Sequence, residues 1–115
     1  MSTLFILNDR PYGSERSYNG LRLAYALAKS GDRVSIFLIG DAAPCAVRGQ
    51  KVPSGYYNME VMLHNVVRQN GIVGVCGSCM DARGMTDEHL VEGTHRSSMD
   101  ELRDWSKLAD KVLVF

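Results

Sequence analysis

VGVCGSCMDARGM, at residues 73–85, is a short apolar run followed by two cysteines two residues apart and then by a charged segment. The apolar run has the length and composition of a buried strand, and the glycine after the first cysteine allows a tight turn. Ser78 and Asp81 have the spacing of a capping box, which predicts a short helix that begins at Cys79 and ends near Gly84. Both thiols therefore lie where a strand turns into a helix.

Apolar runs of the same kind occur elsewhere in the chain, at residues 4–7, 34–39 and 112–115. Continuous runs of this length are typical of strands buried on both faces, as in a parallel sheet. Between the runs, apolar residues recur every three or four positions, which predicts helices. Asn58 stands at an N-cap position, and Ser98 with Glu101 has capping-box spacing. The predicted helical segments cover residues 18–28, 41–48, 59–67 and a stretch that begins at residue 98.

The alternation of strands and helices predicts an α/β fold with an open, mostly parallel sheet covered by helices on both faces. A chain of 115 residues is expected to form a single domain, residues 1–115, with a core of its own. In such sheets, ligands bind beyond the carboxyl ends of the strands. Residues 8–14, 40–45 and 76–84 follow the first three strands, so we expect them to gather at that edge.

Composition excludes several classes of function. Thirteen basic residues balance thirteen acidic ones, so no charge excess indicates a nucleic-acid or membrane partner. The N-terminus has no features of a signal peptide, and no apolar stretch approaches the ~20 residues of a membrane span. We therefore expect a cytoplasmic protein with reduced thiols, in which three cysteines, an odd number, do not form a structural disulfide set.

Neither a metal site nor an organic cofactor is expected. Zinc needs two ligands besides the cysteine pair, and Cys45, His64, His89 and His95 supply no second pair at a ligand spacing. The histidines are interpreted as surface residues. Cys45 stands in the apolar segment AAPCAV and is interpreted as a core residue.

The thiol pair gives the candidate catalytic residues Cys76, Cys79 and Arg83. A thiol near a helix N-terminus, with an arginine close in sequence, is expected to have a lowered pKa and to react as thiolate. The loop 10–14 leads into a helix and could hold an anion on backbone N–H groups, although it lacks the glycine spacing of a dinucleotide or P-loop motif. The candidate substrate-binding residues at this edge are Asn8, Tyr12, Gly13, Asp41 and Gly77.

Short motifs along the whole chain resemble the DsrE/DsrF-like family of small sulfur-transfer proteins, and most closely its homo-oligomeric YchN-like branch. The motifs occur in order: PYGSE at 11–15, LRLAYAL at 21–27, GDA at 40–42, RGQK at 48–51, GYYNMEVML at 55–63, C-x-x-C-x-D-x-R-G at 76–84 and ADKVLVF at 109–115. The resemblance implies a three-layer α/β/α fold of the DsrEFH-like type, with about five strands, that assembles into homotrimers or homohexamers.

The resemblance also implies a role for the first cysteine of the pair. In relatives that work in sulfur relays, a cysteine after the third strand accepts sulfur as a persulfide and hands it on, and Cys76 matches that cysteine. Cys79 matches the second cysteine of the YchN-like branch, and in this chain it either resolves a persulfide on Cys76 or is a neighbour only. The leading hypothesis is thus a sulfur carrier, a possible sulfurtransferase, with donor and acceptor proteins as partners. The alternatives are an oligomeric binding or regulatory protein with a pocket at the subunit interface, and a dithiol oxidoreductase.

Overall fold

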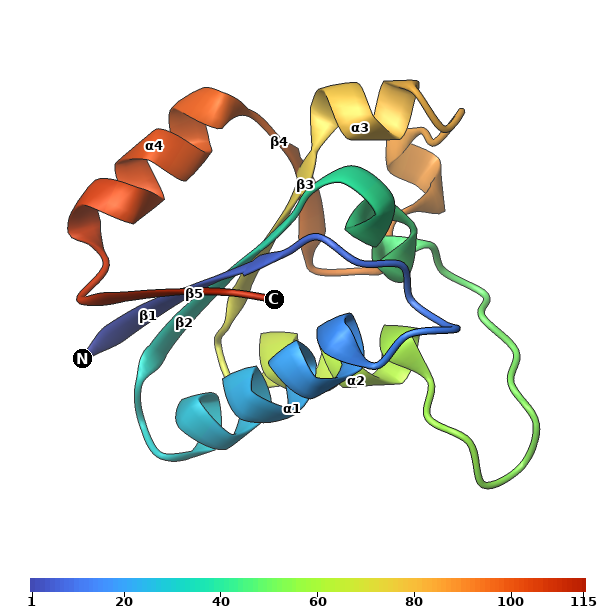
Figure 1. Cartoon of the computed structure of the whole chain (residues 1–115), viewed down its shortest axis with the longest axis horizontal. Coiled ribbons are helices and arrows are strands. Elements are labelled where there is room, and N and C mark those ends of the chain that lie inside the picture. The colour runs from blue at the N-terminus through green and yellow to red at the C-terminus, as the bar shows by residue number, and fades with distance from the viewer.

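Five parallel strands form the centre of the protein, in a computed structural model that describes all of residues 1–115. The strands stand in the order β4-β3-β2-β1-β5, so their carboxyl ends lie along one edge (Figure 1). Strands were predicted over four of these five segments, and the structure confirms all four. The strand bounds are β1 (Ser2–Leu7), β2 (Arg33–Leu38), β3 (Ile72–Cys76), β4 (Thr94–Ser97) and β5 (Lys111–Val114).

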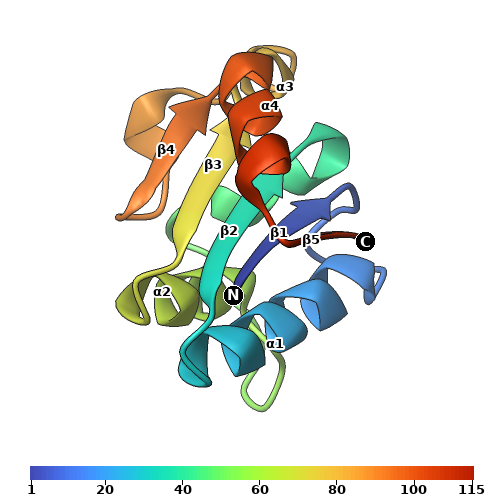
Figure 2. The ribbon, with the colours of Figure 1, turned by 90° about the vertical axis from the view of Figure 1, so that its left-hand side faces the viewer.

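Helices cover the two faces of the sheet unequally. The helices α1 (Arg16–Lys29) and α2 (Met59–Arg68) lie on one face, and α4 (Met99–Leu108) lies alone on the other (Figures 1 and 2). The three-layer α/β fold expected from the sequence is thereby confirmed. The Asn58 side chain accepts a hydrogen bond from the Val61 N–H, and Ser98 Oγ accepts one from the Glu101 N–H, each at 3.2 Å. No helix combines the length and the apolar character that crossing a membrane requires.

The hydrophobic core is correspondingly lopsided. Twenty buried residues form one cluster on the α1 and α2 side of the sheet, whereas the α4 side has a cluster of three, namely Leu4, Phe37 and Cys76. Trp105 of α4 packs against this smaller cluster, with its ring at 85° to that of Phe37. The large cluster therefore holds most of the apolar area that stabilises the fold, and the small one contains a thiol.

The strand β4 was not predicted, because residues 94–97 were interpreted as part of a polar loop. The segment pairs with β3 as an edge strand, with Gly74 opposite His95 and Cys76 opposite Ser97. An edge strand with little burial needs no apolar run, so its sequence, THRS, gave no periodic signal. His95 stays partly exposed there, and its Nε2 lies 2.5 Å from Glu101 Oε1.

Three short helices lie in the connections between strands. The 3₁₀ helix η1 (Gly40–Ala46) follows β2, α3 (Gly77–Asp81) follows β3, and the 3₁₀ helix η2 (Asp87–His89) precedes β4. The helices η1 and α3 contact each other at the carboxyl edge of the sheet (Figure 1). This contact brings the segments after the second and third strands together, as the carboxyl-edge argument predicted.

Candidate functional site

The cysteine pair lies at the junction of β3 and α3. Cys76 is the last residue of β3 and the N-cap residue of α3, so the helix begins at Gly77 and not, as predicted, at Cys79. The predicted capping box of Ser78 and Asp81 is wrong, because no side chain caps this helix. Ser78 Oγ lies instead 3.3 Å from Cys76 Sγ. The Ser78 side chain therefore forms its hydrogen bond with the Cys76 thiol and does not cap the helix.

Gly77 is required by a close approach and not by an unusual backbone angle, since its φ is not positive. A Cβ at this position would lie 2.9 Å from Nε of Arg96, whose guanidinium packs against the glycine. Arg96 belongs to β4 and forms a bidentate pair with Asp81, at 2.9 and 2.8 Å. The missing side chain of Gly77 thus lets a cation from a neighbouring strand approach the start of α3.

The two thiols have opposite tendencies to ionise. Burial raises the pKa of Cys76, but hydrogen bonds from the side chains and backbone N–H groups of Cys79 and Ser78 outweigh it, so the pKa lies below the ordinary thiol value. Burial and the hydrogen bond to Cys76 raise the pKa of Cys79, although the Gly40 N–H and Arg83 oppose the rise. The pair therefore favours a thiolate on Cys76, which accepts a hydrogen bond from the S–H group of Cys79.

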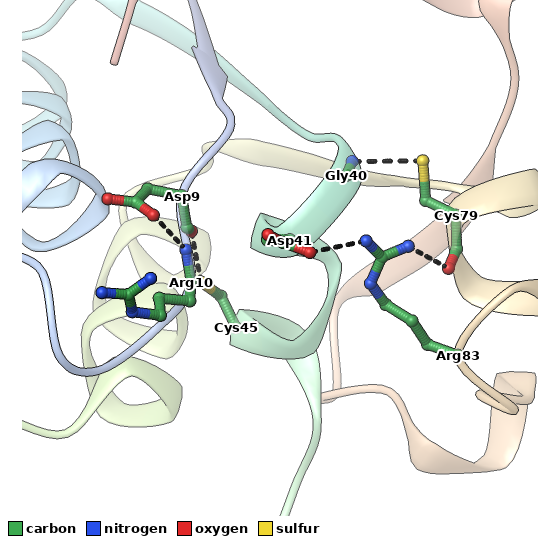
Figure 3. A network of polar contacts seen from close by, with 7 residues as sticks. All are labelled: Asp9, Arg10, Gly40, Asp41, Cys45, Cys79 and Arg83. Atoms are coloured by element: carbon green, nitrogen blue, oxygen red, sulfur yellow. Dashed lines mark hydrogen bonds and ion pairs between the residues drawn. The ribbon is translucent and has the colours of Figure 1, made fainter.

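Cys79 is connected to η1 by polar contacts. Its Sγ accepts a hydrogen bond from the Gly40 N–H at 3.1 Å (Figure 3). Arg83 donates to the Cys79 carbonyl oxygen at 3.0 Å and pairs with Asp41 at 2.7 Å. Asp41 was predicted to bind substrate; here it holds Arg83 beside the second thiol.

The cation beside the first thiol is Arg96, which packs against Gly77, and not the expected Arg83. Arg83 makes no hydrogen bond to Cys76, and its charge acts on Cys79. Hydrogen bonds to Asp81 raise the pKa of Arg96, and the charge of Cys76 adds to the rise, so Arg96 is a cation that faces this thiol. The sequence interpretation missed Arg96 because its approach depends on the pairing of β4 with β3, which no local pattern indicates.

Cys45 lies apart from the pair, in a buried position at the end of η1. Its Sγ is 3.9 Å from the carbonyl oxygen of Asp9 (Figure 3). Burial raises the pKa of Cys45 to about 12. Cys45 packs in the large core cluster, as its apolar setting in the sequence predicted.

The remaining candidate residues fall into a second group. Tyr12 and Gly13 line an open cleft of ≈ 430 Å³ together with residues of the 51–57 loop, and neither cysteine of the pair lines it. The Tyr12 ring stacks on Tyr57 at 5.5 Å between centroids, and its hydroxyl accepts from the Met59 N–H. Asn8 bonds to the chain end, its Nδ2 lying 3.2 Å from the Phe115 carbonyl oxygen. The structure therefore divides the predicted substrate-binding residues among three places: the cysteine pair, the cleft and the chain end.

The scattered His, Cys, Asp and Glu side chains do not assemble a metal site: no three of them lie together in a way that could hold an ion. His64 and His89 are exposed, the latter in η2, and His95 is partly exposed in β4. The chemistry that this edge offers is therefore that of the two adjacent thiols, flanked by Arg83 and Arg96.

Known proteins resemble the chain along its whole length. The family model of the DsrE/DsrF-like family matches residues 1–115. Protein YchN of Escherichia coli K12 is 40% identical over 114 residues, which cover 97% of each chain. An uncharacterized protein of Methanocaldococcus jannaschii is 36% identical over 115 residues, covering 100% of both chains.

Solved structures show the same fold. The crystal structure of YchN from E. coli superposes with a TM-score of 0.91 at 40% identity and covers 100% of both chains. A protein of unknown function from Methanobacterium thermoautotrophicum has a TM-score of 0.77 at 14% identity, over 97% of each chain, and supports the fold alone. With a match along its whole length and a relative at 40% identity, the chain belongs to the DsrE/DsrF-like family.

Proposed function

We propose that the protein is a small sulfur-relay protein that accepts sulfane sulfur as a persulfide on Cys76 and passes it on. The observation that carries the proposal is the environment of Cys76, where hydrogen bonds from Ser78 and Cys79 favour the thiolate at the carboxyl edge of the sheet. Thiolate is the form that attacks sulfur. Membership of the DsrE/DsrF-like family supports the same chemistry.

The transfer needs no organic cofactor. The Cys76 thiolate attacks the outer sulfur of a donor persulfide, R–S–SH, and a new sulfur–sulfur bond forms as the bond to the donor breaks. The products are Cys76–S–SH and the donor thiolate, so charge and atoms balance. Arg96, on the side of Cys76, stabilises the negative charge before the attack. An acceptor thiolate removes the outer sulfur by the same step in reverse.

This function is tested by incubating the protein with cysteine and a cysteine desulfurase and then measuring its intact mass. The decisive sample is Cys79→Ser, because it leaves Cys76 with no second thiol beside it. We expect this variant to gain one sulfur, about 32 Da, and Cys76→Ser to gain none. Uptake that does not depend on Cys76 would refute the role of this residue.

The same samples distinguish the rival functions. The packing of Cys79 against the cluster that contains Cys76 is the observation that favours a dithiol oxidoreductase. Such an enzyme would lose two hydrogens in the wild type, while Cys79→Ser would take up no sulfur. A binding or regulatory protein would change mass in none of the samples.

We further propose that the protein works in the cytoplasm as a homotrimer or homohexamer with donor and acceptor proteins. The α4 side of the sheet exposes apolar side chains that a second copy could cover, namely Ile72, Leu108, Val112 and Val114. Light scattering should give a multiple of 12.7 kDa. Val114→Asp is expected to lower that mass, and Leu23→Asp, at an exposed position on α1, is the matched control. A monomeric wild type would contradict the assembly.

A further inference from the structure

The burial of Cys76 determines what can reach a persulfide formed there. The residue is only 4% exposed, whereas Cys79, one helical turn later, is partly exposed. Cys76 is the N-cap residue of α3, Cys79 is the third residue of that helix, and its side chain packs against the small cluster that contains Cys76. A sulfur carried on Cys76 therefore lies close to a more exposed thiol of the same chain.

Burial and Cys76 raise the pKa of Cys79, and two groups in its surroundings oppose that rise. The Gly40 N–H points at Cys79 Sγ from 3.1 Å, and it stabilises negative charge on that sulfur. Arg83 is held close by two contacts, one to the Cys79 carbonyl oxygen and one to Asp41, and its charge also favours the thiolate of Cys79. These groups have no function in the transfer from a donor to Cys76, so the carrier role leaves them unexplained.

The third thiol is excluded from this chemistry by its position. Cys45 Sγ faces the carbonyl oxygen of Asp9, an acceptor that disfavours a thiolate. The side chain is fully buried at the opposite end of η1 from Gly40. Cys45 belongs to the large core cluster, whereas Cys79 packs against the small cluster that contains Cys76.

We propose that Cys79 is a resolving thiol that ends the persulfide on Cys76 by releasing hydrogen sulfide, so that the site reduces sulfane sulfur as well as carrying it. This inference rests on the proposed function. Cys79 Sγ attacks Cys76 Sγ, a bond forms between these two atoms, and the bond from Cys76 Sγ to the outer sulfur breaks. The outer sulfur leaves with the electron pair and takes the proton of Cys79.

The electrons balance within the protein. The two cysteine sulfurs are oxidised to a disulfide, and the sulfane sulfur is reduced to sulfide. A thiol reductant then supplies two electrons to restore the free cysteines. An acceptor thiol and Cys79 thus compete for the same persulfide, and the outcome depends on whether an acceptor is bound.

A single-turnover experiment tests the inference. The protein is loaded with cysteine and a cysteine desulfurase, freed of both by gel filtration, and then followed by intact mass and sulfide assay without reductant. We expect the wild type to lose the gained sulfur, release one equivalent of sulfide and end two hydrogens lighter than its reduced form, with a Cys76–Cys79 disulfide in peptide maps. Cys79→Ser should keep its sulfur and release no sulfide. Cys45→Ala, the matched control, should behave like the wild type.

The possible failures are distinguishable. A wild type that keeps its added sulfur as long as Cys79→Ser does would overturn the resolving role and leave the carrier intact. Absence of any sulfur gain in Cys79→Ser would overturn the carrier and the inference together. Sulfide release that persists in Cys79→Ser would assign the reduction to another group.

A second measurement concerns the part played by Arg83. Replacing it by Gln should raise the pKa of Cys79, and a rise of about one unit should slow sulfide release about threefold near neutral pH, because the smaller thiolate fraction is partly offset by higher nucleophilicity. The pH profile of sulfide release should shift to higher pH in Arg83→Gln, and Arg83→Lys should return it to the position of the wild type. An unmoved profile in Arg83→Gln would show that this charge does not act on the resolving step.

Discussion

Two thiols lie at opposite ends of η1 in different polar surroundings. At its beginning, the Gly40 N–H donates to Cys79 Sγ, and at its end Cys45 Sγ faces the carbonyl oxygen of Asp9 (Figure 3). A donor favours the thiolate, and an acceptor beside a buried thiol favours the neutral form. Burial raises the pKa of both thiols, to about 12 for Cys45, whereas the Gly40 N–H and Arg83 oppose the rise at Cys79. The difference shows that burial and the neighbouring polar groups together decide how readily each cysteine of this protein ionises.

The largest expected effect of this difference is on alkylation. With a pKa of about 12, Cys45 is ionised at pH 7 to about one part in 10⁵, roughly a thousandfold less than an ordinary thiol. We expect iodoacetamide to label Cys76 first, with a rate that rises with pH through a pKa below the usual thiol range. Peptide mass spectrometry at several pH values measures the three rates. Labelling of Cys45 in the folded protein as fast as that of Cys76 would contradict the comparison.

The second effect is on stability at high pH. The unfolded chain loses the Cys45 proton above its ordinary pKa of 9.0, whereas the native state keeps it up to about pH 12. The native state therefore binds more protons in this window, and stability falls as pH rises, by about 1.4 kcal/mol per unit and about 4 kcal/mol in all. Urea unfolding of wild type and Cys45→Ala between pH 8 and 11 measures the difference in slope. Parallel curves would show that the buried thiol does not resist ionisation.

A smaller effect is expected at Gly77. In Gly77→Ala the new Cβ meets the Arg96 guanidinium, which must move away from the start of α3. Because this is the end of a flexible side chain, we expect a loss of about 1 kcal/mol, together with a higher pKa of Cys76. Urea unfolding measures the loss of stability, and titration of the thiol measures the pKa of Cys76. In an Arg96→Ala background the substitution should cost almost nothing, and an equal cost in the two backgrounds would exclude the clash.

The smallest effect is expected at Asp41. Its pair with Arg83 is exposed, so Asp41→Asn should change the free energy of unfolding by only about 0.5 kcal/mol. Release of Arg83 should nevertheless slow the ionisation-dependent alkylation of Cys79 more than that of Cys76. Asp100→Asn, which affects a pair within α4, is the control. A similar change at both thiols would mean that Arg83 does not distinguish them.

Local patterns in the sequence were sufficient for most of the fold. Continuous apolar runs in the sequence indicate the buried strands β1, β2 and β3. The helix caps at Asn58 and Ser98 are also local, because each side chain binds an N–H only three residues further along the chain. β4 lacked such a signal because an edge strand of four residues buries little. Its existence depends on pairing with β3, more than eighteen residues earlier in the chain.

The site could be predicted only in part, for the same reason. The carboxyl-edge rule brought the cysteine pair and Asp41 to one place, because it depends on topology alone. It could not identify which arginine faces which thiol. Arg83 is close in sequence to both cysteines but is held by Asp41, and Arg96 reaches Gly77 across a strand pairing.

The hydrogen bond from Gly40 to Cys79 has a spectroscopic consequence. In an amide labelled with nitrogen-15, the proton that points at the sulfur is sensitive to whether that atom is a thiol, a thiolate or part of a disulfide. The amide resonance of one glycine would therefore follow the state of a cysteine on another segment of the chain. A single peak in a two-dimensional NMR spectrum could time each turnover without any chemical label on the sulfur itself.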